Sequence, residues 1–167
     1  MSSQQELNDQ LIDAVNAGDL GEVRRLLAAG ADVNARDKST REGVTPPVND
    51  PVETALIVAV SNENLPIARL LLESGAEPDC WTDGDPYSAL LLAVMDNSIE
   101  MVKLLVDHGA DINWAPMGDN CLMVAYNRGS REMFDYLLKR GADPHKKTVW
   151  GDNFYQYAVR LGRERWI

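Results

Sequence analysis

The chain has 167 residues, of which 45% are apolar and 25% charged, a balance typical of a globular domain rather than a disordered chain. Its net charge of −10 is uneven: residues 1–113 carry 20 acidic and 7 basic residues, net −13, whereas residues 114–167 carry 6 acidic and 9 basic residues, net +3. The acidic excess argues against nucleic acid and anionic lipid as partners, and the sequence has no apolar run long enough to span a membrane.

Residues 11–35, LIDAVNAGDLGEVRRLLAAGADVNA, predict two short helices joined by a turn. An apolar stretch, a polar turn and a second apolar stretch follow one another, which is the pattern of a helical hairpin. Ala14 stands where two helices must approach closely, and Gly30 follows the second apolar stretch, where a left-handed residue ends a helix. The preceding residues, MSSQQELNDQ, lack the pattern of a secretory signal.

Residues 39–50, STREGVTPPVND, interrupt the pattern and have no hydrophobic periodicity. Ala14 lies 45 residues before its counterpart Ala59, whereas the three later spacings of this alanine are 34, 32 and 33. The excess of about 12 residues predicts an insertion in a loop between two repeats, not a linker between two domains. Pro46 and Pro47 stiffen this insertion and prevent a regular strand. It is either a contact surface or a tolerated loop, and its candidate contacts are Arg41, Glu42, Val44, Pro46 and Pro47.

Three further segments, residues 55–79, 89–113 and 121–145, repeat the pattern of the first. The alanine and the glycine are 16 residues apart in all four copies, in the pairs Ala14 and Gly30, Ala59 and Gly75, Ala93 and Gly109, and Ala125 and Gly141. Polar residues five positions before the alanine predict helix N-caps at Thr54, Ser88, Asn120 and Asn153. Because one hairpin cannot bury its own apolar face, we expect neighbouring hairpins to stack.

A fifth copy begins in residues 153–167, NFYQYAVRLGRERWI, with Ala158 in the alanine position. It stops before its glycine, as its second helix would begin. Trp166 and Ile167 are apolar residues with little chain left to cover them. We expect that they fold back on the fourth repeat, and the alternative is that they form a docking patch.

The copies LLAAGADVNA, LLLESGAEPD, LLVDHGADIN and LLKRGADPH resemble the ankyrin repeat, and the resemblance covers residues 8 to 167. It implies an all-α ankyrin-repeat solenoid of stacked helix-turn-helix units with finger loops, with four full repeats and a C-terminal partial one. We expect a single domain over 1–167, with repeats at about 8–35, 36–79 with an inserted finger at 38–52, 80–113, 114–145 and 146–167. The first-helix motifs TALIVA, SALLLA, NCLMVA and NFYQYA lack the family's histidine, which weakens the hydrogen-bond network within each loop.

Residues with catalytic or metal-binding chemistry are sparse. His108 stands at a predicted helix C-terminus and His145 in a finger, and neither has a partner at metal-ligand or triad spacing. Cys80 and Cys121 lack such spacing too, and we expect them to be reduced thiols that fill the core of a cytoplasmic protein. No phosphate-binding or nucleophile motif is present. We therefore expect no enzyme activity, no cofactor and no metal.

The fingers carry the aromatic residues expected of a binding surface. Three of the four tryptophans fall in finger segments, where Trp gives large contact area at low entropic cost, although some could instead pack back on the stack. The resemblance implies a concave surface made of the fingers and the first helix of each repeat. The candidate partner-binding residues are Trp81, Asp83, Asp85, Tyr87, Met95, Asp96, Trp114, Met117, Asn127, Arg128 and Trp150.

The family implies protein recognition without catalysis, and its small stand-alone members include kinase inhibitors and immunity proteins that block a toxin. We therefore expect that the chain binds one protein through its concave groove and fingers and inhibits or neutralises it. Acidic residues in the fingers favour a partner with a basic surface, such as a toxin, an enzyme or a regulator, although the charge could serve solubility alone. The alternatives are an adaptor or scaffold, an accessory subunit that modulates an enzyme, and a structural spacer. We expect a monomer when free, and neither nucleic acid nor membrane as a partner.

Overall fold

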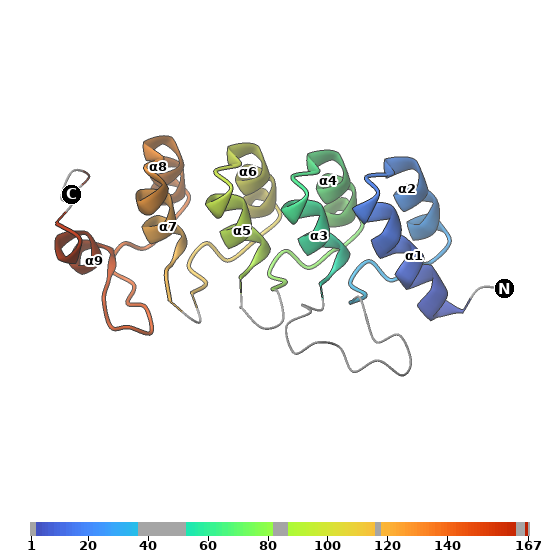
Figure 1. The fold of residues 1–167 in the computed structure, drawn as a ribbon, viewed down its shortest axis with the longest axis horizontal. Coiled ribbons are helices and arrows are strands. Elements are labelled where there is room, and N and C mark those ends of the chain that lie inside the picture. The colour runs from blue at the N-terminus through green and yellow to red at the C-terminus, as the bar shows by residue number, and fades with distance from the viewer. Residues whose placement is uncertain (1–2, 37–52, 82–86, 116–117, 163–165, 167) are drawn as a thin grey trace. The chain divides into compact units, whose positions relative to one another are not determined.

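The computed structural model describes residues 3–36, 53–81, 87–115, 118–162 and 166, and these residues form nine α-helices (Figure 1). The described residues contain no β-strand beyond two isolated bridges. The predicted all-α class of helix pairs is therefore confirmed. The chain divides into two compact units, a first unit over Met1–Ala89 and a second over Leu90–Ile167.

The first unit consists of two helical hairpins. Their helices are α1 (Gln4–Asn16), α2 (Leu20–Ala28), α3 (Ala55–Ser61) and α4 (Leu65–Glu73). Within each hairpin the two helices pack together, and the hairpins stack with α1 against α3 and α2 against α4 (Figure 1). Ala14 and Ala59 are both buried, which confirms their predicted place where the helices meet.

The polar residues before the helices supply the hydrogen bonds that begin them. The hydroxyl of Thr54, the predicted cap of α3, accepts from the backbone N–H of Ile57 at 3.3 Å. The first helix begins at Gln4, four residues before the predicted repeat start at residue 8. Ser3 and Glu6 cause this extension, because each side chain accepts from the backbone N–H of the other in a capping box.

Each second helix ends as the sequence predicts. Gly30 and Gly75 follow the capping residues of α2 and α4 with φ of +94°, a left-handed conformation that costs glycine little. In the second unit, Gly109 has φ of +94° and Gly141 of +100°. The 16-residue spacing that all four copies share thus corresponds to a recurring chain reversal.

Asn34 joins the loops of the two hairpins in the first unit. Its side-chain amide donates to the carbonyl of Gly75 at 3.2 Å, and its side-chain oxygen accepts from the N–H of Glu77 at 2.8 Å. Two residues later, Arg36 forms an antiparallel bridge with Thr54. This bridge joins the two flanks of the predicted insertion, whose residues 38–52 lie outside the described part of the chain.

The second unit continues the pattern with one hairpin, a second hairpin and a single helix. These are α5 (Ala89–Met95) with α6 (Ile99–Asp107), α7 (Cys121–Arg128) with α8 (Arg131–Lys139), and α9 (Phe154–Arg160). The helix α7 packs against both α8 and α9. Asn113 repeats the loop contact of the first unit, since its amide donates to the carbonyl of Gly141 at 3.0 Å and its oxygen accepts from the N–H of Asp143 at 2.8 Å.

Trp166 folds back on the fourth repeat. Its ring centre lies 5.0 Å from that of Tyr126 in α7 and 5.1 Å from that of Phe134 in α8. The guanidinium carbon of Arg131 lies 5.8 Å from the same ring. The fold-back prediction is therefore confirmed for Trp166, whereas Ile167 lies outside the described residues.

Candidate functional site

The predicted site residues divide between the two units. In the first unit the structure describes Trp81 and Tyr87, and in the second Met95, Asp96, Trp114, Asn127, Arg128 and Trp150. The other candidates, Asp83, Asp85 and Met117 of the fingers and Arg41, Glu42, Val44, Pro46 and Pro47 of the insertion, lie outside the described residues.

Trp81 and Tyr87 stand at the base of one finger in the first unit. Trp81 forms an antiparallel bridge with Ser88, and the N–H of Ala89 donates to the carbonyl of Cys80 at 3.1 Å, so the finger is closed where it meets α5. Trp81 is 43% exposed and Tyr87 38%. The two rings are thus presented to solvent from a backbone that is pinned by hydrogen bonds.

Arg36 from the preceding finger lies over the ring of Trp81. Its guanidinium carbon is 5.7 Å from the ring centre, within the range of a cation–π contact. Consecutive fingers thereby bring a cation and an exposed indole together. Arg36 was not among the predicted site residues, because no local sequence pattern indicates that its loop reaches the next finger.

The two cysteines are buried free thiols. Burial raises the pKa of Cys80, against lowering effects from hydrogen bonding with Thr54 and from the charge of Arg36. Burial also raises the pKa of Cys121 to about 12. Because the thiolate is the reactive form, both side chains behave as small apolar residues of the core, as the sequence predicts.

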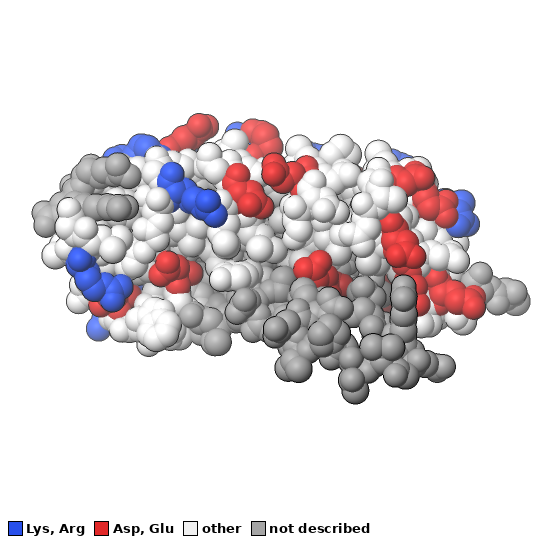
Figure 2. Space-filling model, in the orientation of Figure 1, with Lys and Arg blue, Asp and Glu red and all other residues white. Residues whose placement is uncertain are grey.

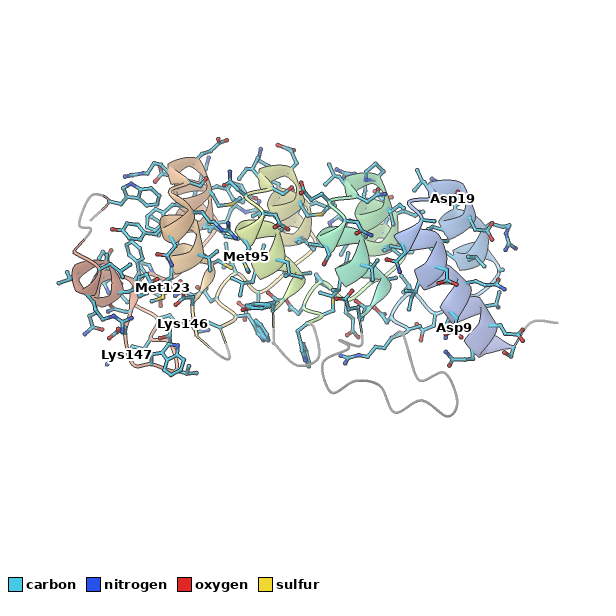
Figure 3. The ribbon with its side chains drawn as sticks, in the orientation of Figure 1. Asp9, Asp19, Met95, Met123, Lys146 and Lys147 are labelled. Atoms are coloured by element: carbon cyan, nitrogen blue, oxygen red, sulfur yellow. The ribbon has the colours of Figure 1, made fainter. Side chains whose placement is uncertain are left out.

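Acidic side chains form a row on α1 in the first unit. Glu6, Asp9 and Asp13 are exposed at helical spacing, and Asp19 caps α2 beyond them. Figure 2 shows this row as red side chains over α1, and Figure 3 labels Asp9 and Asp19 along it. The described acidic surface thus includes α1, in addition to the acidic finger residues predicted from the sequence.

In the second unit, Met95 is the last residue of α5, and Asp96 begins the turn into α6. Met95 is half-buried and Asp96 is exposed, and the N–H of Asp96 donates to the carbonyl of Leu92 at 3.0 Å. Trp114 is half-buried, and its backbone N–H donates to the carbonyl of Asp111 at 3.1 Å. Met95 and Trp114 therefore contribute only part of their surface to solvent.

Asn127 belongs to a polar network between α7, α9 and the finger that precedes α7. Its amide donates to the hydroxyl of Tyr157. Burial raises the pKa of the nearby Asp119, whereas the charge of Arg160 and a hydrogen bond with Tyr157 act to lower it. Arg160 also pairs with Asp152 at 3.1 Å and lies 5.5 Å from the ring centre of Tyr157. Asp119, Tyr157 and Arg160 were not predicted site residues.

Arg128 and Trp150 are both exposed predicted residues of the second unit. Arg128 is exposed at the end of α7, and Trp150 is 71% exposed on the finger that precedes α9. Lys146 and Lys147 lie on the same finger, where Figure 3 labels them. The C-terminal finger therefore combines an aromatic side chain with two cations.

The described residues provide no cluster of three or more His, Cys, Asp or Glu side chains suited to a metal ion. His108 acts locally, since its Nδ1 donates to the carbonyl of Leu104 at 2.8 Å at the end of α6. Within the same described residues, every helix is too short or too polar to cross a membrane. In each unit the candidate site is thus a set of exposed aromatic, acidic and basic side chains on fingers and first helices.

Comparison with known proteins identifies the repeat. A family model described as ankyrin repeats in three copies matches residues 11–113 and, in an overlapping match, residues 56–148. The mitochondrial disaggregase of Bos taurus is 38% identical over 79 residues, which are 47% of this chain and 10% of that protein. The mitochondrial disaggregase of Homo sapiens is 37% identical over 79 residues, 47% of this chain and 9% of that protein. Each match therefore covers about a tenth of the relative's length.

Proposed function

This chain belongs to the ankyrin-repeat family, and on that premise we propose that it is a non-catalytic module that binds one protein partner through its fingers and first helices. One observation carries the proposal. Trp81 and Tyr87 are exposed on a finger whose base is hydrogen-bonded, and Arg36 lies over Trp81. Rigid aromatic side chains beside an arginine are the residues that most often dominate the binding energy of protein interfaces.

The acidic side chains favour a partner with a basic surface. Glu6, Asp9 and Asp13 line α1, and Asp96 is exposed at the end of α5. Carboxylates of this kind speed the encounter with a positively charged protein and select against negatively charged ones. If the partner uses its basic surface for its own activity, binding there inhibits it without any further chemistry. Inhibition or neutralisation is therefore our first proposal for the consequence of binding.

A second candidate function is an adaptor or an accessory subunit of an enzyme. The observation that favours it is the similarity to two mitochondrial disaggregases, in which the matched residues are a small part of a longer chain. In this case the repeats would hold a protein partner for another component instead of blocking it. A cytoplasmic location stays part of the proposal, and the free thiols of Cys80 and Cys121 are compatible with it.

The test compares partner binding by the wild type, Trp81→Ala and the control Leu138→Ala. Leu138 is 37% exposed, close to the 43% of Trp81, but lies on the second helix α8. Affinity capture first identifies a partner. Titration calorimetry should then show that Trp81→Ala raises the dissociation constant by about 30-fold and that Leu138→Ala leaves it unchanged. Equal affinities for all three proteins would refute the role of the finger. The partner's activity in the complex then separates inhibition from an adaptor role.

A further inference from the structure

The C-terminal finger, residues 143–153, is a rigid loop. The N–H of Gly151 donates to the carbonyl of Thr148 at 2.9 Å, and the N–H of Thr148 donates to the carbonyl of Asp152 at 2.9 Å. Thr148 is only 7% exposed and anchors this turn. At the base, the N–H of Phe154 donates to the carbonyl of Pro144 at 3.1 Å. The two residues at the corner of the turn, Val149 and Trp150, are therefore held outward by the backbone.

These two corner residues are the most exposed large apolar side chains of the described residues, at 60% for Val149 and 71% for Trp150. The indole of Trp150 nevertheless has a fixed neighbour. Gly118 of the preceding finger has φ of +150°, and a Cβ built there would lie 3.0 Å from Nε1 of Trp150. The missing side chain of Gly118 thus leaves room for the ring. An indole held in place before binding loses little freedom when a partner covers it.

The finger also carries two lysines, neither of which forms an ion pair with the described residues. The ammonium group of Lys146 donates to the carbonyl of Asn113 at 2.6 Å, a neutral acceptor that fixes the side chain without cancelling its charge. Lys147 is exposed and forms no ion pair with the described residues. The nearby carboxylate of Asp152 is already paired with Arg160. Asp143 is exposed, and one of its side-chain oxygens accepts from the N–H of His145.

We infer that the tip formed by Lys146, Lys147, Val149 and Trp150 docks into an acidic, apolar-lined site on a protein partner. The inference rests on the proposed function and adds to it, because the charge of this tip is opposite to that of α1. A protein is favoured over a lipid or nucleic acid surface, since two lysines are few cations for an extended array of phosphates and the two corner residues of the tip are apolar.

The test uses the full chain and selection from a random peptide library. We expect the wild type to enrich peptides that combine Asp or Glu with large apolar residues. Such a peptide, synthesised and labelled, should bind the wild type and lose affinity about 10- to 100-fold with Trp150→Ala. Lys147→Glu should weaken it in a salt-dependent way, whereas the control Lys139→Glu, the same change on an exposed lysine of α8, should not. Circular dichroism verifies that each variant is folded.

Selection of basic or uncharged peptides, or acidic peptides that bind Trp150→Ala as tightly as the wild type, would overturn the inference. Vesicles of phosphatidylserine and phosphatidylcholine provide the competing outcome, because binding to them that Trp150→Ala abolishes would assign the tip to membranes instead. Failure of this inference can be distinguished from failure of the proposed function. A natural partner whose affinity changes with Trp81→Ala but not with Trp150→Ala retains the binding function and rejects this tip.

Discussion

Replacing Trp166 with alanine tests whether the C-terminus stabilises the second unit. The ring lies at 5.0 Å from Tyr126 and 5.1 Å from Phe134, and Arg131 lies over it at 5.8 Å. An aromatic pair contributes about 0.5–1.5 kcal/mol beyond the area that it buries, and an exposed cation–π contact about 0.5–1 kcal/mol. Because Trp166 is only half-buried and regains side-chain freedom when released, we expect a loss of about 2 kcal/mol in the free energy of unfolding.

Urea denaturation followed by circular dichroism measures this loss, and Trp150→Ala is its matched control. The control removes the same side chain from a position that is 71% exposed, so its cost should stay below about 0.5 kcal/mol. Hydrogen exchange should place the loss of protection of Trp166→Ala in α7 and α8, which carry Tyr126 and Phe134. If the two variants unfold at the same urea concentration, the contacts of Trp166 do not stabilise the repeat and the reasoning fails.

Two further predictions concern a carboxyl that is exposed but partly desolvated, and a helix end. Burial raises the pKa of Asp119 above its ordinary value of 3.8, so the folded state is favoured while the group is protonated and loses that advantage as the pH rises through the folded pKa. Asp119→Asn should therefore increase the free energy of unfolding slightly at pH 7, because solvent around the exposed side chain screens the effect. The gain should vanish below about pH 3.8, which denaturation at both pH values tests, and a gain that persists in acid would contradict the prediction. Gly75→Ala should cost about 1 kcal/mol through backbone strain alone, because φ is +94° and no atom lies within 4 Å of the added Cβ. Thermal or urea denaturation should rank Gly75→Asn between glycine and alanine, since Asn tolerates this conformation better; an unchanged stability of Gly75→Ala would show that the loop relaxes.

Local rules were enough to predict most of the fold. Thr54, Asn120 and Asn153 cap helices because a short polar side chain can accept a backbone N–H at a helix start, whatever lies around it. Gly75 ends a helix for an equally local reason. The early start of α1 was readable as well, because Ser3 and Glu6 have the spacing of a capping box.

The contacts of the candidate site were less accessible to sequence reasoning. Arg36 meets Trp81 only because successive fingers lie side by side, and residues so distant in sequence share no periodicity. Asn127 was predicted as a contact residue from its place in a first helix, but its side-chain amide donates a hydrogen bond to Tyr157 of the next helix. Sequence patterns assign residues to a face, whereas the partners on that face depend on how the repeats stack.

The contacts of Asn34 have a consequence for how such a chain can change over evolutionary time. Asn34 binds Gly75 and Glu77 before the chain enters the long loop, and the bridge between Arg36 and Thr54 fixes the points where that loop leaves and rejoins the body. These contacts align one hairpin on the next from positions outside residues 37–52. Lengthening a loop whose ends are already fixed costs little, about 0.6 kcal/mol for each doubling. We therefore expect insertions and substitutions within residues 38–52 to be tolerated, so that new recognition sequences can be gained there while the helices keep their register.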